Sequence, residues 1–499
     1  MKNRLNVENR QTEHLALPFA QLNGFYACNQ MPKGLLQEIE YVIDLAKRFN
    51  KEVVEPRFLD IDLQAHQDHQ YLPQDLIDKA NQWGFYTLWL PQIAGGKGFN
   101  PSSLPFFCEE ISSTCVTMAN LIGAHYLGIV GLSLSLNYHL SLSISKEVAK
   151  GERDNHPTIC SFAITEPNAG SDSQYTELMD RGKLRCHARK VDGGYRINGT
   201  KVFISNGHFS TWHIVFSYSD IKKPSKSIMV FAVKTGTEGF QIARHENKMG
   251  QKGCPASELV FSDCFIPEDQ ICFDMNWLSQ QGRDSLAGDS SGFSLAQGNI
   301  GAFSSGVARG ALNDAVNYAQ NTVINGKRLI DQEWAQCHLA NMYQNATLAR
   351  LAFMEGVSVS LNTQFPKKYY YFNKFFPHSI FRFLADKFLS ASVGTKLRKF
   401  IVNNLDSESQ TPTNKDSHQL VAGMGSLAKV AASDLAVKNC QLAVELMATE
   451  GVRHSRGAEK RLRDSRLLQI YEGTNQMNRL NIFKALIAPY GKDIKMYEG

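Results

Sequence analysis

Apolar residues recur at helical spacing through the first third of the chain. Across residues 34–49 they form one apolar face, made by Leu35, Leu36, Ile39, Val42, Ile43 and Ala46. The same spacing predicts a second helix over 75–83, which ends at Gly84, a residue type that often stops helices. The segment LWLPQIAGGKGFNP then predicts a loop, because its prolines and glycines cannot all be helical. Helical spacing resumes from about residue 104 to residue 150.

The pattern changes near Pro157 to short β-rich runs separated by glycine turns. The clearest run is YRINGTKVFIS, in which we predict that Asn198 and Gly199 join two alternating strands as a tight hairpin. Further strands are predicted within three runs: 213–218, 227–233 and 259–261. No GxGxxG motif follows a strand, so a Rossmann dinucleotide site is not expected.

Helical spacing returns over 293–361 and 420–450, so strands lie between two sets of helices. This order predicts an α+β protein, and the length of 499 residues suggests about three domains. The predicted segments are an N-terminal extension (1–33), a helical domain (34–156), a central β domain (157–282) and a C-terminal helical bundle (283–499).

Composition places the chain among soluble globular proteins, with 43% hydrophobic and 20% charged residues. A formal net charge of +5 is small for this length. It argues against a positive electrostatic potential over the whole surface that would attract polyanions such as nucleic acids. The N-terminus lacks the apolar stretch of a signal peptide, and no run approaches the roughly 20 apolar residues of a spanning helix. We therefore expect a cytoplasmic protein, at most peripheral to a membrane.

The ten cysteines are scattered, without a CxxC pair or a Cys/His cluster of zinc spacing, so no metal site is expected. Buried, reduced thiols are the expected state.

Residues 362–418 interrupt the last helical region with a different composition. They include KKYYYFNKFFPHSIFRFLADKF, in which nine aromatic residues alternate with basic ones. Such a segment suits a membrane surface, and less well single-stranded nucleic acid. It suits best a helical excursion that packs on the bundle or on a partner subunit. All three interpretations stay open on the sequence.

Three segments have the residue types of a ligand or catalytic site. CSFAITEPNAGSD (160–172) runs from a strand into a turn rich in hydroxyls and backbone amides, which suits a polar planar ligand. In TKVFISNG (200–207), Phe203 and Ser205 share a strand face, so an aromatic ring lies beside a hydroxyl. In RDSRLLQIYEGTNQMNR (463–479), Glu472 follows an apolar run, where burial would raise its pKa towards that of a general base. Taken singly, each segment also has an ordinary structural explanation.

Together the three segments resemble, in order and spacing, the motifs of the FAD-dependent acyl-CoA dehydrogenase family. The resemblance runs from about residue 34 to about 487, apart from 362–418, and TEPNAGSD with IYEGTNQ is its most specific part. The loop LPQIAGGKGF and the stretch 247–271 are also similar to family segments. The resemblance implies a helical N-terminal domain, a central β-barrel-like domain and a C-terminal four-helix bundle, with FAD between the last two.

The resemblance also implies roles for individual residues. Glu472 would abstract the α-proton of an acyl-CoA thioester while the β-hydride passes to flavin N5, in fatty acid metabolism. The cofactor would be held by Phe162, Ile164, Thr165, Phe203, Ser205, Thr474 and Gln476. Ser171 and Gly473 would contact the substrate. An electron-transfer flavoprotein as electron acceptor and a homodimer or homotetramer are implied as well.

Three positions depart from the family pattern. A cofactor-binding arginine is replaced by Thr322, with Lys327 or Arg328 nearby. A glycine pair appears as Ala448-Thr449, and an arginine at the start of the first bundle helix appears as Gln297. These departures put cofactor retention or assembly in doubt, but none of them is the base.

The sequence leaves other functions open. The acyl group could be carried by a carrier protein instead of CoA, and the reduced flavin could react directly with oxygen. In a fourth interpretation, the chain is a catalytically weak family member that binds membrane or nucleic acid through 362–418. The intact Glu472 and TEPNAGSD argue against that last interpretation.

Overall fold

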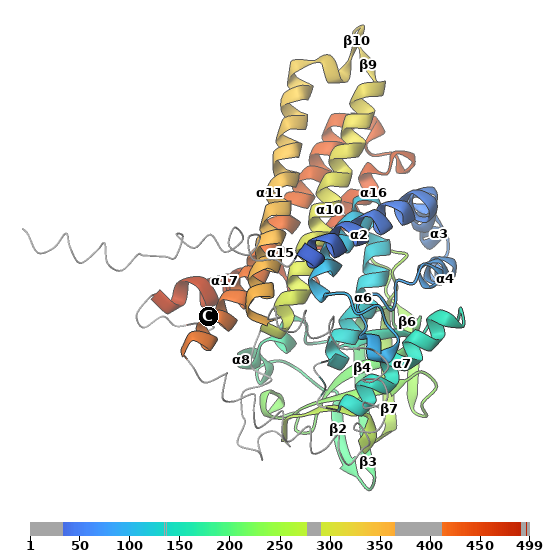
Figure 1. Cartoon of the computed structure of the whole chain (residues 1–499), viewed down its shortest axis with the longest axis vertical. Coiled ribbons are helices and arrows are strands. Elements are labelled where there is room, and N and C mark those ends of the chain that lie inside the picture. The colour runs from blue at the N-terminus through green and yellow to red at the C-terminus, as the bar shows by residue number, and fades with distance from the viewer. Residues whose placement is uncertain are drawn as a thin grey trace, which may run out of the picture.

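The computed structural model describes residues 33–133, 135, 137–276, 291–364, 412–490 and 496. Most of the 362–418 insertion, and with it the choice among its three interpretations, lies outside these residues. In the described chain a helical layer, a central sheet and a set of long helices follow one another (Figure 1). This order of helices, sheet and helices confirms the predicted fold class.

The first layer is built from amphipathic helices whose apolar faces meet in one core. Gly84, at φ 76°, ends α4 as predicted. The region predicted as one helical stretch over 104–150 is divided into three helices. The layer comprises α2 (Lys33–Phe49), α3 (Asp60–Gln67), α4 (Gln74–Gln82), α5 (Leu104–Thr114), α6 (Val116–Ser133) and α7 (Tyr138–Arg153).

The central domain is an eight-stranded sheet of order β6-β7-β3-β2-β4-β5-β8, with β1 parallel to β4. Both faces of the sheet are buried: Ile214 of β4 faces the helices, and the next residue, Val215, faces the core of the β domain. The strands are β1 (Ile159–Ala163), β2 (His187–Val191), β3 (Gly194–Ser205), β4 (Ser210–Tyr218), β5 (Ile228–Lys234), β6 (Phe240–His245), β7 (Ala256–Pro267) and β8 (Ile271–Asp274). A short helix, α8 (Thr176–Met179), lies between β1 and β2.

The predicted hairpin at Asn198-Gly199 is wrong. Both residues lie inside the single strand β3, at a register irregularity against β7. The turn is instead at Asp192 and Gly193, between the paired residues Val191 and Gly194. A β-carbon on Gly199 would lie 2.6 Å from the Cα of Cys186, the residue before β2, so this glycine permits a close approach of that segment rather than a turn.

The C-terminal region is dominated by three long helices that pack together: α10 (Ser291–Asn321), α11 (Glu333–Gln364) and α15 (Pro412–Met447). A two-stranded hairpin, β9 (Val323–Ile324) with β10 (Lys327–Arg328), joins α10 to α11 at the end of the molecule farthest from the sheet (Figure 1). Two shorter helices, α16 (Ala458–Leu467) and α17 (Asn475–Ile482), pack on α15.

One helical segment, 419–450, is long and apolar enough to cross a bilayer by length and composition. Two thirds of its apolar window (67%) is buried within the fold, as in the core helix of a bundle. All nine described cysteines are free thiols and all but Cys337 are buried, as expected from their scatter.

Candidate active site

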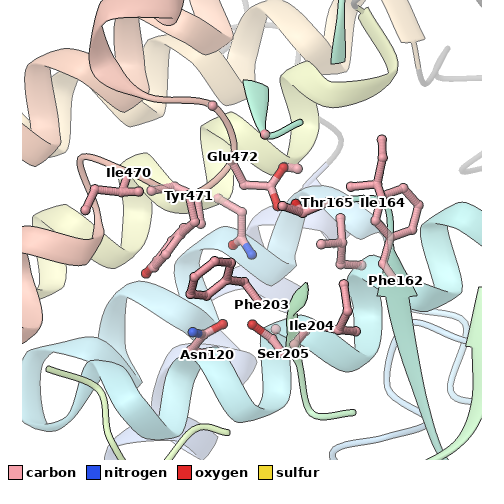
Figure 2. A pocket seen from close by; sticks show the side chains of 18 of the residues that line it. Asn120, Phe162, Ile164, Thr165, Phe203, Ile204, Ser205, Ile470, Tyr471 and Glu472 are labelled. Atoms are coloured by element: carbon pink, nitrogen blue, oxygen red, sulfur yellow. The ribbon is translucent and has the colours of Figure 1, made fainter. Parts of the chain in front are cut away.

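A cavity of about 620 Å³ lies where the central sheet, α6, α10 and the turn between α16 and α17 meet (Figure 2). The residues predicted for the site that line it are Phe162, Ile164, Thr165, Ser171, Phe203, Ser205, Glu472, Gly473 and Thr474. Gln476 is not among the lining residues, because it lies on the exposed side of α17. Three segments far apart in the sequence therefore meet around one cavity.

The close packing of α6 on β1 shapes one wall. A β-carbon at Gly131 would lie 2.8 Å from the ring of Phe162, and one at Gly128 would lie 2.8 Å from the β-carbon of Cys160. These two glycines let the helix approach the strand closely. Phe162 and Ile164 are thereby held beside the cavity (Figure 2).

A buried ion pair fixes the chain that leaves β1. Lys201 Nζ lies 2.8 Å from Glu166 Oε1, and both side chains are almost fully buried. Lys201 also donates to the carbonyl of Ile164 at 3.0 Å, and Glu166 accepts from the backbone N–H of Cys186 at 3.1 Å. With these additional partners the pair locks the Thr165 turn against β3.

Phe203 occupies the cavity wall in a strained conformation. Its φ of 58° lies in the left-handed region, which aromatic residues rarely adopt, and its side chain is 57% exposed. The register of β3 shifts between Lys201 and Ile204, so alternation fails and Phe203, Ile204 and Ser205 all line the cavity. An exposed flat ring held by strained backbone is typical of a ligand-stacking position.

Glu472 lies opposite, on the turn between α16 and α17. Its φ of 53° and that of Gly473, 80°, place two successive residues in the left-handed region. The side chain points into the cavity near Thr165 (Figure 2). Burial raises the pKa of the Glu472 carboxyl to about 7, against the opposing charge of Lys429. A carboxyl with this pKa can accept a proton near neutral pH.

Hydrogen bonds hold the strained turn in place. Asn478 Nδ2 donates to the carbonyls of Gly473 (2.8 Å), Thr474 (3.1 Å) and Glu472 (3.3 Å). The backbone N–H of Thr474 donates to Ser171 Oγ at 3.2 Å, which joins the turn to the TEPNAGSD segment. Among the described residues, the backbone N–H of Glu472 donates to no acceptor and is available to a ligand.

Several polar residues at or beside the site were not predicted from the sequence. Asn120 on α6 donates to Gln251 Oε1 at 3.0 Å, and Gln251 Nε2 donates to the hydroxyl of Tyr471 at 3.2 Å. The buried Oδ1 of Asn299 faces no hydrogen-bond partner within the described structure. Tyr471 could have been expected because it precedes Glu472. Asn120 and Asn299 lie in apolar helices, whose sequences indicate only buried core positions.

The positions that depart from the family pattern lie apart from the base. Thr322 is at the end of α10, beside the β9–β10 hairpin, and Arg328 is bonded to Asp331 at 2.8 Å. Gln297 is buried and accepts from Ser426 Oγ at 3.2 Å. Ala448 adopts φ 47°, so it keeps the backbone conformation that a glycine would favour there.

A group of possible metal ligands, Asp62, His454 and Glu459, lies within the described chain but does not line the cavity. Arg463 donates to Asp62 Oδ2 at 2.7 Å and to Glu459 Oε1 at 3.0 Å. The Arg463 guanidinium is therefore already paired with both carboxylates of this group.

Comparison with known proteins gives matches along most of the chain. The sequence models of the acyl-CoA dehydrogenase N-terminal, middle and C-terminal domains match residues 37–135, 161–264, and 289–389 with 410–487. The chain is 26% identical over 464 residues to a cyclohex-1-ene-1-carbonyl-CoA dehydrogenase of Geobacter metallireducens, covering 92% of this chain and 100% of the relative.

Two solved structures share the fold. One is a chain from a structure of the electron transferring flavoprotein of Acidaminococcus fermentans, with TM-score 0.69, 22% identity, and coverage of 90% of this chain and 97% of that one. The other is a glutaryl-CoA dehydrogenase from Mycobacterium smegmatis in complex with FADH2, with TM-score 0.67, 20% identity, and coverage of 91% and 96%.

Proposed function

The chain belongs to the acyl-CoA dehydrogenase family, and from that premise we propose that it desaturates an acyl-CoA thioester, with Glu472 removing the α-proton. Family membership makes the protein an oxidoreductase that acts on acyl-CoA. The observation that carries the finer proposal is the carboxyl of Glu472. It lines the cavity with a pKa raised to about 7, opposite the exposed ring of Phe203.

The wall of the cavity fits FAD, the cofactor of this family. Phe203 offers an exposed ring, and the hydroxyls of Thr165 and Ser205 lie on the same wall as the apolar side chains of Phe162 and Ile164. A planar heterocycle with a polar edge matches this combination. When bound there, FAD supplies the acceptor for the hydride that leaves the β-carbon. Thr474 lies on the wall and is proposed to contact it too, whereas the exposed Gln476 could do so only outside the cavity of this chain.

The chain's own residues would handle the proton and the developing charge. The Glu472 carboxylate takes the α-proton, since the other carboxylate that lines the cavity among the described residues, that of Glu166, is held in the ion pair with Lys201. The backbone N–H of the same residue donates to the thioester oxygen as that oxygen gains enolate character. Gly473 and Ser171 line the cavity beside the base and orient the thioester between base and cofactor.

The carrier, the electron acceptor and the assembly are also part of the proposal. The relative from Geobacter metallireducens is named for a CoA thioester, which favours CoA over a carrier protein. Likeness to a chain in an electron transferring flavoprotein structure supports such a flavoprotein as acceptor. Exposed apolar residues on α11 support a homo-oligomer. A cytoplasmic location and membrane contact through 362–418 stay predictions.

Glu472→Gln tests the proposal. The variant keeps the size of the side chain but removes the base, so anaerobic bleaching of the flavin by acyl-CoA thioesters should slow by about 10²–10⁴-fold. The panel should include straight-chain and cyclic thioesters, and Glu445→Gln, at an exposed position of α15, serves as control. Bleaching by no CoA thioester in the wild-type protein would favour a carrier-bound substrate. A protein that takes up no added FAD would overturn the proposal.

A further inference from the structure

We infer that Lys429 is the positioning residue of Glu472: its buried ammonium anchors the turn that bears the base and keeps the carboxylate ionised. This inference rests on the proposed role of Glu472. Lys429 lies on α15, 43 residues before the base, and does not line the cavity.

The geometry of Lys429 is directed at the turn. Its side chain is fully buried, and Nζ donates to the carbonyl oxygen of Gly473 at 2.8 Å and to Asn475 Oδ1 at 2.6 Å. Gly473 O also accepts from Asn478, so two donors pull on one carbonyl in the left-handed stretch of the turn. This anchor fixes where the Glu472 side chain leaves the backbone.

The charge of Lys429 has no direct partner. Within the described residues, no carboxylate oxygen lies within 4.0 Å of its Nζ, although buried lysines elsewhere, such as Lys201 and Lys460, each have one. A buried ammonium without a paired anion carries a desolvation cost that its two uncharged acceptors offset only in part. The arrangement is therefore explained better by an electrostatic effect on the site than by stability.

Lys429 and Glu472 act on each other at a distance. Burial lowers the pKa of Lys429 to about 7, and the negative charge of Glu472 opposes that lowering. The positive charge of Lys429 in turn opposes the raised pKa of Glu472. The other charged groups that act on Lys429 are Asp434, which favours its protonated form, and Arg479, which disfavours it. Near neutral pH the lysine and the glutamate therefore titrate as a coupled pair.

The test compares Lys429→Met, which removes both the charge and the donor, with Lys429→Gln, which keeps an uncharged donor. Lys438→Met, an exposed lysine on the same helix, is the matched control. The readout is the protonated carboxyl band of Glu472 in infrared difference spectra of the FAD-loaded protein without substrate. The band is assigned by its absence in Glu472→Gln. It is titrated in parallel with the pH dependence of flavin bleaching.

Without the lysine charge, the protonation midpoint of Glu472 should rise by about 1 pH unit or more in Lys429→Met. Because the carboxylate is the base, the acid limb of the bleaching profile should move up by the same amount. For a rise of one unit from about 7, the rate at pH 7 should then fall about fivefold and recover at higher pH. Lys438→Met should leave both midpoints unchanged.

Lys429→Gln separates charge from anchoring. It should restore much of the thermal stability lost in Lys429→Met but keep the raised midpoint. A midpoint unchanged from wild type in Lys429→Gln, or in a folded Lys429→Met, would overturn the inference. If no thioester bleaches the wild-type flavin, the proposed function fails, while the infrared midpoints still decide the role of Lys429.

Discussion

Two residues that face each other across the cavity, Phe203 and Glu472, adopt backbone conformations that cost free energy. A non-glycine residue in a sparsely populated region costs roughly 1–3 kcal/mol and persists only where the surroundings enforce it. At Glu472 the enforcing groups are Lys429 and Asn478, which bind the following carbonyl. The strain is thus concentrated where the ring and the base must be aimed at one ligand.

Substituting Phe203 by asparagine should separate ligand binding from stability. Asparagine tolerates the left-handed region, so the FAD-free protein should be as stable as wild type or more stable, by up to about 1 kcal/mol. Loss of the aromatic ring should weaken FAD binding about tenfold. Thermal unfolding and flavin fluorescence titration measure the two effects.

Phe265→Asn, at an exposed phenylalanine of β7 that does not line the cavity, is the control and should leave FAD affinity unchanged. Unchanged FAD affinity in Phe203→Asn would show that the ring does not contact the cofactor.

Site residues that belong to local sequence motifs could be predicted from the sequence. Residues that reach the site from distant parts of the chain could not. Glu472 and Phe203 belong to short segments whose composition already suggested chemistry. Lys429 reads as one more polar position of a long helix, and Asn120 meets Gln251 across 131 residues of sequence. Such partners are set by tertiary packing, which no local pattern records.

At the scale of elements, helix and strand types were predictable, but the internal structure of β3 was not. Asn-Gly is a strong turn signal, yet here it forms an irregularity inside a strand, while the turn falls at Asp192 and Gly193. The reason is that Gly199 faces the backbone of Cys186, the residue just before the neighbouring strand β2. Close approach between strands and a tight turn both favour glycine, and the sequence alone does not distinguish them.

The end of α15 offers a prediction at this scale. Ala448 is exposed and has φ 47°, a conformation that costs an alanine roughly 1–2 kcal/mol. Replacing Ala448 by glycine removes this cost, but the greater backbone entropy of glycine in the unfolded chain offsets about 0.5–1 kcal/mol of the gain. Ala448→Gly should therefore stabilise the protein by about 0.5–1 kcal/mol. Chemical denaturation measures the change. The neighbouring Thr449→Gly, where φ is ordinary, should instead destabilise; stabilisation by both variants would contradict the explanation.

At the scale of the whole molecule, one face of α11 is left uncovered. Trp334 with Cys337 and, about three turns further along, Leu348 with Leu351 form an exposed stripe on one side of the helix, which Asn341 and Gln344 interrupt. Apolar side chains gathered in this way mark an association surface. We therefore expect the protein to associate in solution through this stripe.

Charged substitutions in the stripe should cause the oligomer to dissociate. Leu348→Lys combined with Leu351→Lys should shift the protein from a dimer or tetramer to a smaller species in sedimentation velocity. Tyr343→Lys, at an exposed position on roughly the opposite side of the helix, should not. A wild-type protein that sediments as a monomer would exclude the stripe as an interface.

The hydrogen bond from Thr474 to Ser171 crosses from the C-terminal helices to the chain that leaves β1, so the cavity is a seam between two domains. A ligand bound between two domains contacts both of them, so its binding free energy stabilises the folded state of both. We therefore expect the free energy of unfolding of this protein to rise as more of its sites are occupied by FAD. Flavin supply would then govern how long each copy of the chain survives, as well as how fast it works.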